Sequence, residues 1–135
     1  MNKPTLIITA GDPGGIGPEV TKKALQDNDI NGLANFLVID SEDETGFSAI
    51  KKAVRILKNK KADALVTAPV NKEAINESGI FFQGHTEYLA KAANTKKFAM
   101  MLCGGPLKVT TVTRHIPIKE VSRHITESKI IDSVM

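Results

Sequence analysis

The chain has 135 residues, with 18 basic and 15 acidic side chains and a formal net charge of +3. Hydrophobic residues make up 41% and charged residues 24%, which is typical of a globular protein and excludes a disordered chain. No apolar run approaches the roughly 18–20 residues of a membrane span, and a single cysteine, Cys103, excludes an internal disulfide framework. We therefore expect one cytoplasmic domain, residues 1–135, with no membrane partner.

The first half of the chain alternates between two hydrophobic periods. Short apolar runs bounded by glycine or proline predict buried strands at residues 6–8, 36–39 and 64–67. Apolar residues at helical spacing predict helices between the strands, at residues 18–26 and 46–59.

The second of these helices is strongly basic. Residues 51–61 contain six lysines and arginines and no acidic residue, a charge pattern that also suits a nucleic-acid surface. No aromatic residue lies among them to stack on bases, and Ile50, Val54 and Leu57 form an apolar stripe through the same segment. The basic residues are therefore interpreted as a solvated helix face, and no nucleic-acid partner is expected.

The second half adds a helix and a different kind of strand pair. A helix is predicted at residues 86–93, followed by strands at 98–102 and 107–113 that a glycine turn joins as an antiparallel pair. Two short helices are expected after them, at residues 119–125 and from 128 onward. The fold class is therefore α/β, with a mostly parallel sheet flanked by helices and an additional antiparallel pair.

The loop that follows the first strand is rich in glycine. Residues 11–19 read GDPGGIGPE, at the sheet edge where parallel α/β folds bind ligands. Pro13 and Pro18 lack the N–H groups that a phosphate cradle uses, so a purely conformational role is an equal alternative. Asp12 in this loop is a candidate for a ribose hydroxyl or a metal, and Lys72, after the third strand, is a weaker candidate for an anionic substrate.

Two further segments place chemically active side chains at the ends of elements. His85 and Thr86 precede a predicted helix, where both can donate hydrogen bonds to an anionic group. The alternative is that Thr86 only caps the helix. His115 continues the alternating face of the last strand, with Arg114 directed the other way, and is a candidate metal ligand or acid–base group. His124 is interpreted as a surface residue.

Four segments together resemble one known family. They read ITAGDPGGIGPEV at residues 8–20, VTAPVNKEAI at 66–75, FQGHTEYL at 82–89 and TRHIPI at 113–118. In this order they are similar to the N-terminal part of the 4-hydroxythreonine-4-phosphate dehydrogenases, the PdxA family, and the resemblance covers residues 5–40 and 46–135.

The resemblance implies a fold like that of isocitrate and isopropylmalate dehydrogenases, here incomplete, and a cytoplasmic homodimer with its site at the subunit interface. It also implies an oxidation that uses NAD or NADP and a divalent metal, Zn, Mg or Co. The substrate would be 4-phosphohydroxy-L-threonine, whose β-keto acid product decarboxylates to 3-amino-2-oxopropyl phosphate in pyridoxal phosphate biosynthesis. By motif, His85 and Thr86 would bind the substrate and His115 would be one of three metal histidines.

The chain departs from the family pattern in two ways. Family members are much longer, and they have an extended stretch after the second strand where this chain has only residues 40–46. We therefore expect the chain to be part of a longer protein, with the other metal ligands and most cofactor contacts elsewhere. Alternatives are an inactive fragment or non-catalytic binding module of the same fold, and a sister dehydrogenase for another hydroxy acid. No general base is assigned.

Overall fold

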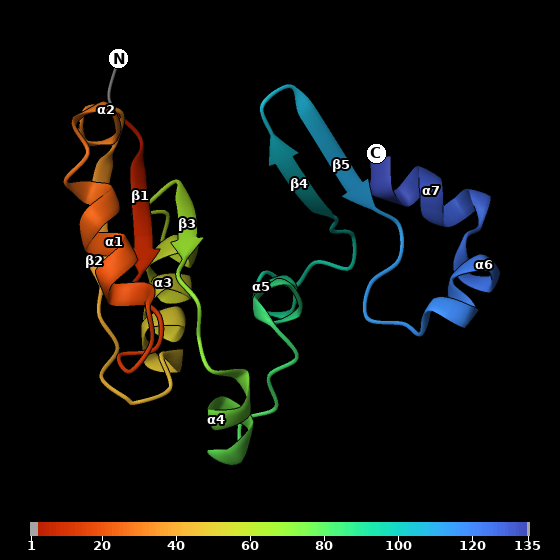
Figure 1. Cartoon of the computed structure of the whole chain (residues 1–135), viewed down its shortest axis with the longest axis horizontal. Helices are drawn as coiled ribbons and strands as arrows, with labels where there is room; N and C mark the ends of the chain where they lie inside the picture. The colour runs from red at the N-terminus through yellow and green to blue at the C-terminus, as the bar shows by residue number, and fades with distance from the viewer. Residues whose placement is uncertain (1–2, 135) are drawn as a thin grey trace. The chain divides into compact units, whose positions relative to one another are not determined.

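The computed structural model describes residues 3–134 of the chain. The chain divides into two compact units, Met1–Ala92 and Ala93–Met135, each of which is described here by itself (Figure 1).

The first unit is built on a three-stranded parallel sheet. Its strands are β1 (Thr5–Thr9), β2 (Asn35–Ile39) and β3 (Ala64–Thr67), in the order β2-β1-β3. Ile7 of the central strand lies opposite Leu37 on one side and Leu65 on the other. The three predicted strands are present, with boundaries shifted by at most one residue. The prediction that all three are buried is wrong for β2 and β3, since Leu37, Val38 and Val66 are 41%, 38% and 49% exposed.

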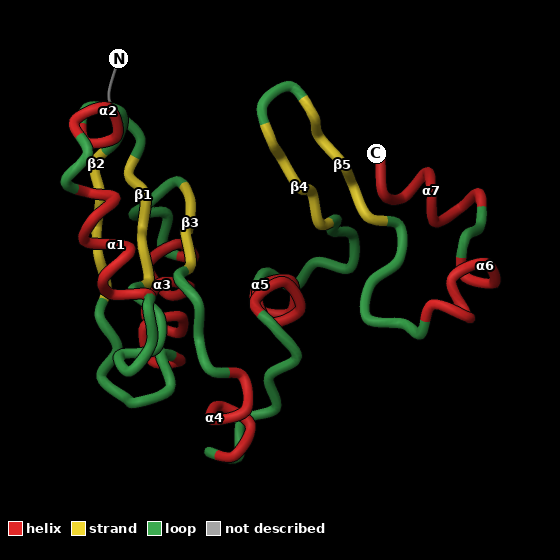
Figure 2. The backbone as a smooth tube through the Cα atoms, viewed as in Figure 1, coloured by secondary structure: helices red, strands yellow, loops and turns green. Residues whose placement is uncertain are grey.

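Five helices belong to this unit. The predicted ones are α1 (Gly17–Leu25), α3 (Phe47–Lys58) and α5 (His85–Ala92), and two that were not predicted are α2 (Asn28–Asn31) and α4 (Lys72–Glu77) (Figure 2). A side-chain cap begins each of the two additional helices, because Asp27 Oδ1 accepts from the Asp29 N–H and Asn71 Oδ1 accepts from the Ala74 N–H.

Helix α3 connects the sheet to the rest of the unit. Its residues Ala49 and Ala53 pack against Ile7 and Ile39 of the sheet. A second cluster joins the beginning of α3 to α4 and to the segment before α5, and consists of Phe47, Ile50, Ile75 and Phe82. The lysines and Arg55 on the opposite side of α3 are exposed, as its amphipathic pattern predicts.

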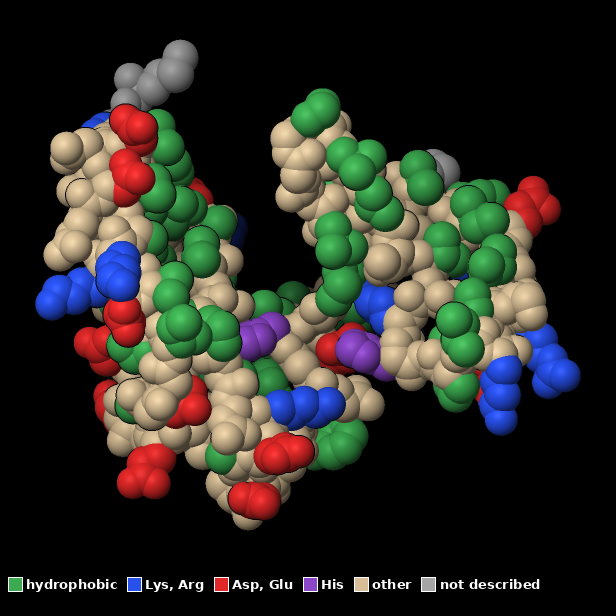
Figure 3. All heavy atoms as spheres, in the orientation of Figure 1, with side chains coloured by type: hydrophobic (Ala, Val, Ile, Leu, Met, Phe, Trp, Pro, Cys, Tyr) green, Lys and Arg blue, Asp and Glu red, His purple; other side chains and the backbone are tan. Residues whose placement is uncertain are grey.

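The second unit begins with an antiparallel pair, β4 (Met100–Gly104) and β5 (Leu107–Thr111), as predicted. A 3-10 turn, η1 (Ile118–Glu120), follows, then α6 (Val121–His124) and α7 (Glu127–Val134). Hydrophobic side chains gather over the hairpin in Figure 3; exposed ones are Met101, Leu102, Leu107 and Val109.

One detail of this unit corrects the sequence analysis. Strand β5 ends at Thr111, so His115 does not continue its alternating face. His115 lies instead in the loop before η1, with a left-handed backbone at φ 53°. The strand pattern failed here because a backbone in the left-handed region does not preserve the side-chain alternation of a strand.

The observed architecture confirms the predicted fold class, a parallel sheet flanked by helices together with an antiparallel pair. No helix in the described part of the chain combines the length and apolar composition that crossing a bilayer requires.

Candidate functional site

The loops that leave the carboxyl ends of the three parallel strands are bonded to one another. The Ala10 N–H donates to Ile39 O at 3.1 Å, the Asp12 N–H donates to Pro69 O at 3.1 Å, and the Ala68 N–H donates to Thr9 O at 2.9 Å. The topology brings these loops together because parallel strands end at the same edge of a sheet.

Glycines make this close approach possible. Gly11 has φ +84°, and a Cβ atom there would lie 2.2 Å from Pro69 O. A Cβ atom on Gly46 would lie 2.7 Å from the Gly11 carbonyl carbon. The backbone of the neighbouring loops fills the space that a ligand would need beside Gly11 and Gly46, so the conformational interpretation of these glycines has direct support.

A pocket of about 650 Å³ remains beside these loops. Its lining includes the carboxylates of Asp12, Glu44 and Glu77 together with Asn71, and no lysine or arginine. The Asp12 carboxylate already accepts the Gly14 N–H at 2.8 Å, and Lys72 is exposed at the start of α4. The carboxylates of this pocket disfavour a phosphate group there, and the candidate roles of Asp12 and Lys72 stay predictions.

The short connection between β2 and α3 is organised by one carboxylate. Asp43 Oδ1 accepts from the Thr45 N–H and hydroxyl at 2.9 and 2.6 Å, and Oδ2 accepts from the Ser48 N–H at 2.7 Å. Burial alone would raise the pKa of Asp43, but these hydrogen bonds outweigh burial and hold the pKa well below its ordinary value. Asp43 thus stabilises the first turn of α3 as a charged cap.

His85 and Thr86 lie at the first turn of α5, where the helix has backbone N–H groups without helical partners. The aromatic cluster positions this turn: the His85 ring meets Phe82 edge-on at 5.6 Å, and Phe82 meets Phe47 of α3 at 5.8 Å. Their placement together at a helix terminus agrees with the sequence prediction, although the helix begins at His85 rather than after Thr86.

Asn76 holds the segment before α5 in place. Its amide nitrogen donates to Phe82 O at 3.0 Å, and its oxygen accepts from the Phe82 N–H at 3.0 Å. The same nitrogen donates to Lys72 O within α4. Sequence reasoning missed Asn76 because nothing in the spacing of α4 and the 80–84 segment indicates that an amide joins them.

The His85 imidazole is the chemically distinctive group of this turn. Its Nε2 atom is buried and has no hydrogen-bond partner in the described part of the chain. Burial lowers the pKa of His85 from its ordinary value of 6.5, so the ring is neutral at neutral pH. A neutral ring with an unused nitrogen can form a hydrogen bond to a ligand oxygen, and Thr86 follows it in the same helical turn.

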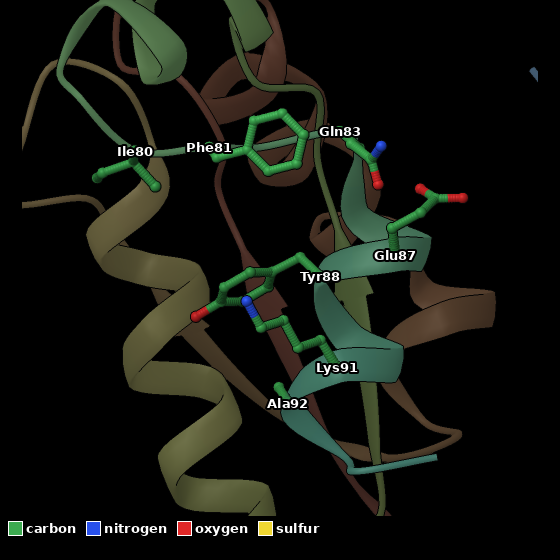
Figure 4. Close-up of a pocket in the computed structure, with 7 residues that line it drawn as sticks. All are labelled: Ile80, Phe81, Gln83, Glu87, Tyr88, Lys91 and Ala92. Atoms are coloured by element: carbon green, nitrogen blue, oxygen red, sulfur yellow. The ribbon is translucent and has the colours of Figure 1, made fainter. Parts of the chain in front are cut away.

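A second pocket, of about 500 Å³, is lined by residues of the segment 80–83 and of helix α5 (Figure 4). Phe81 is 83% exposed at its border. In Figure 4, Tyr88 and Lys91 extend from α5 to one side, whereas Gln83 and Glu87 point to the other. Burial raises the pKa of Tyr88, so its hydroxyl keeps its proton. This pocket mixes an apolar wall with one cation and one carboxylate, and it does not include His85.

His115 belongs to the second unit, and its meeting with His85 and Thr86 stays a prediction. Among residues 3–134, no three His, Cys, Asp or Glu side chains are grouped so that they could hold a metal ion. The described residues therefore do not form a complete metal centre, and the role of His115 as a metal ligand stays a prediction.

Comparison with known proteins identifies the family. The family model described as "Pyridoxal phosphate biosynthetic protein PdxA" matches residues 23–135. A 4-hydroxythreonine-4-phosphate dehydrogenase of Sulfurihydrogenibium sp. is 36% identical over 177 residues, covering 96% of this chain and 55% of that protein. The corresponding protein of Pseudoalteromonas translucida is 49% identical over 82 residues, covering 58% of this chain and 25% of that protein.

Solved structures agree in fold. A 4-hydroxythreonine-4-phosphate dehydrogenase from Burkholderia phymatum superposes with a TM-score of 0.82 at 24% identity, covering 99% of this chain and 57% of that one. The enzyme of that name from Klebsiella pneumoniae gives 0.81 at 24% identity, covering 98% and 57%.

The lengths of the matches show how much of its relatives this chain covers. The chain spans about half the length of the curated relatives that it matches over nearly its whole extent. The match of 177 residues exceeds the 135 residues of this chain, so the Sulfurihydrogenibium protein has a longer segment inside the matched region, as the short connection at residues 40–46 leads one to expect. The chain belongs to the PdxA family of pyridoxal phosphate biosynthetic proteins.

Proposed function

We propose that this chain supplies the N-terminal part of a 4-hydroxythreonine-4-phosphate dehydrogenase. The reaction would oxidise the secondary alcohol of 4-phosphohydroxy-L-threonine, with NAD or NADP accepting the hydride, and the β-keto acid would lose carbon dioxide to give 3-amino-2-oxopropyl phosphate. Family membership and the names of the relatives support this proposal.

The observation that supports this proposal most directly is the buried, unpartnered Nε2 atom of His85 in the first turn of α5. Substrate binding there would give the buried His85 Nε2 a hydrogen-bond partner, and backbone N–H groups of the helix start and the Thr86 hydroxyl would add donors to an anionic oxygen. The aromatic cluster and Asn76 hold the turn rigid, so little ordering would be required on binding.

Different parts of the chain bear on the cofactor and on the metal. A nicotinamide ring would accept the hydride, but Gly11 and Gly17, at the two ends of the loop that the sequence offered as an anion cradle, are packed against backbone. His115 provides one imidazole for a divalent Zn, Mg or Co ion, and the remaining ligands would come from outside the described residues. A homodimer in the cytoplasm would allow a second copy to complete the site.

A non-catalytic binding module of the same fold is the second candidate. Such a module would bind a phosphorylated ligand at α5 without any dependence on metal or nicotinamide. A sister dehydrogenase for another hydroxy acid would differ only in which alcohol is oxidised.

The test is the appearance of NAD(P)H from 4-phosphohydroxy-L-threonine with zinc, magnesium or cobalt, using the native protein after its intact mass has been measured. We expect metal-dependent turnover, and His85→Gln should raise KM by about ten- to a hundredfold because a charge-assisted hydrogen bond is lost. The matched control is His124→Gln, since the His124 ring nitrogen Nδ1 already lies 2.9 Å from Glu120 O, at the residue before α6. Absence of turnover with every metal and both cofactors would contradict the dehydrogenase proposal.

A further inference from the structure

Arg114 packs against an aromatic ring at the open end of the β4–β5 hairpin. Its guanidinium carbon lies 4.5 Å from the centroid of the Phe98 ring. Phe98 precedes the start of β4 and Arg114 follows the end of β5, so the contact joins the two chain segments that leave the hairpin. A guanidinium over an aromatic face at this distance is attracted by the ring quadrupole.

The next residue has an unusual backbone. His115 adopts φ 53° although it carries a Cβ atom, and such a conformation persists where neighbouring contacts hold it. Arg114 is half-buried whereas His115 is exposed. On the other side, Ile116 precedes Pro117, which restricts Ile116 to extended conformations.

We propose that Arg114 is a positioning residue for His115, with its stacking on Phe98 fixing the direction in which the imidazole leaves the backbone. The Arg114–Phe98 contact anchors the loop at the residue immediately before the left-handed turn, and Pro117 stiffens it two residues after. The imidazole between these points is then held in one orientation. This inference rests on the proposed role of His115 as a ligand of the metal.

Amide hydrogen exchange of the whole chain tests the anchor. Arg114→Met and Phe98→Leu should each speed exchange in residues 112–116 about three- to tenfold, as expected for loss of one partly exposed cation–π contact. The double variant should exchange no faster than either single variant, and Phe98→Tyr should restore protection because it keeps the ring. Arg123→Met is the matched control, since Arg123 is exposed on α6.

The ring signals of His115 in nuclear magnetic resonance provide a second measurement, assigned by comparison with His115→Asn. We expect them to move in Arg114→Met and Phe98→Leu but not in Phe98→Tyr or Arg123→Met. Unchanged exchange and unchanged His115 signals in Arg114→Met would overturn the inference, as would effects of Arg114→Met and Phe98→Leu that simply add.

These measurements separate the inference from the proposed function. If the protein is not a dehydrogenase, no variant or metal will produce NAD(P)H, yet exchange and His115 signals will still respond to Arg114. If only the positioning role is wrong, turnover will depend on His115 while Arg114→Met leaves exchange, ring signals and turnover unchanged.

Discussion

Two buried polar atoms of the first unit, Thr9 Oγ1 and His85 Nε2, have no hydrogen-bond partner within the described part of the chain. Thr9 is 0% exposed in the central strand, on the same side as Ile7, which packs against α3. His85 instead begins a helix whose first N–H groups are also free of helical partners. The unpaired Thr9 hydroxyl therefore lowers stability, whereas the turn that holds His85 is where we propose that a ligand binds.

Replacing Thr9 by valine should leave the free energy of unfolding unchanged or raise it by up to about 1 kcal/mol, because the shape is kept and an unpaired hydroxyl is removed. Urea unfolding followed by circular dichroism measures it. Ile7→Val, in the same strand, is the control and should cost about 0.5–1.5 kcal/mol. A loss in Thr9→Val as large as that control would show that the hydroxyl has a stabilising partner.

The depressed pKa of His85 makes stability depend on pH. Below 6.5 the unfolded chain binds a proton that the folded ring still rejects, so the free energy of unfolding should fall as pH falls from 6.5 towards the lower folded pKa. Unfolding measured between pH 8 and pH 5 should show this slope, and His85→Gln should flatten it relative to His124→Gln. Equal slopes in both variants would assign the effect to another group.

The left-handed backbone of His115 predicts an order of stability among variants that all lack the imidazole. His115→Gly and His115→Asn should unfold at higher denaturant than His115→Ala, by about 1 kcal/mol, because glycine and asparagine tolerate positive φ. Thermal and urea unfolding of the three variants measure this difference in stability. An alanine variant as stable as the glycine variant would mean that the loop relaxes without strain.

At the scale of elements, the beginning of α3 depends on its cap. Asp43 accepts hydrogen bonds from Thr45 and Ser48, and Gly46 at φ 82° permits the turn that brings them together. The same turn packs against Gly11, so the cap of α3 also supports the loop after β1.

Asp43→Ala should lower the free energy of unfolding by about 1–2 kcal/mol, the usual cost of losing a helix cap. In the unmodified protein this contribution is present above pH 3.8 and should be lost as pH falls through 3.8 towards the depressed folded pKa. Glu44→Ala, at the neighbouring exposed position, is the control. Acid unfolding that is the same in Asp43→Ala and Glu44→Ala would refute the capping role.

The elements that the sequence predicted are those with strong apolar periodicity. The apolar runs of β1, β2 and β3 and the amphipathic face of α3 match few other secondary structures. The short helix α4 was overlooked although Asn71 before it and Gly79 after it, at φ 84°, are ordinary boundary signals. The end of β5 was misjudged because alternation in sequence continues beyond the last paired residue, Thr111.

At the scale of the whole molecule, the sequence placed His85 and Thr86 correctly at a helix terminus but could not reveal how that turn is supported. The supporting contacts are those of Asn76 with Phe82, six residues later, and of Phe47 with Phe82, and neither follows a helix or strand spacing. The metal and cofactor assignments came from resemblance to longer proteins, of which this chain spans about half. Among residues 3–134, no three His, Cys, Asp or Glu side chains are grouped so that they could hold a metal ion, so the metal assignment stays a proposal.

The measurement that tests the account most directly is titration of the His85 ring with 4-phosphohydroxy-L-threonine, followed by nuclear magnetic resonance of the imidazole. The account predicts a saturable change at His85, with its pKa rising as the anion binds, and no such change with unphosphorylated 4-hydroxythreonine or at His124. A His85 signal that ignores the phosphorylated compound, in a protein whose fold is intact, would contradict the assignment of this turn as the substrate site.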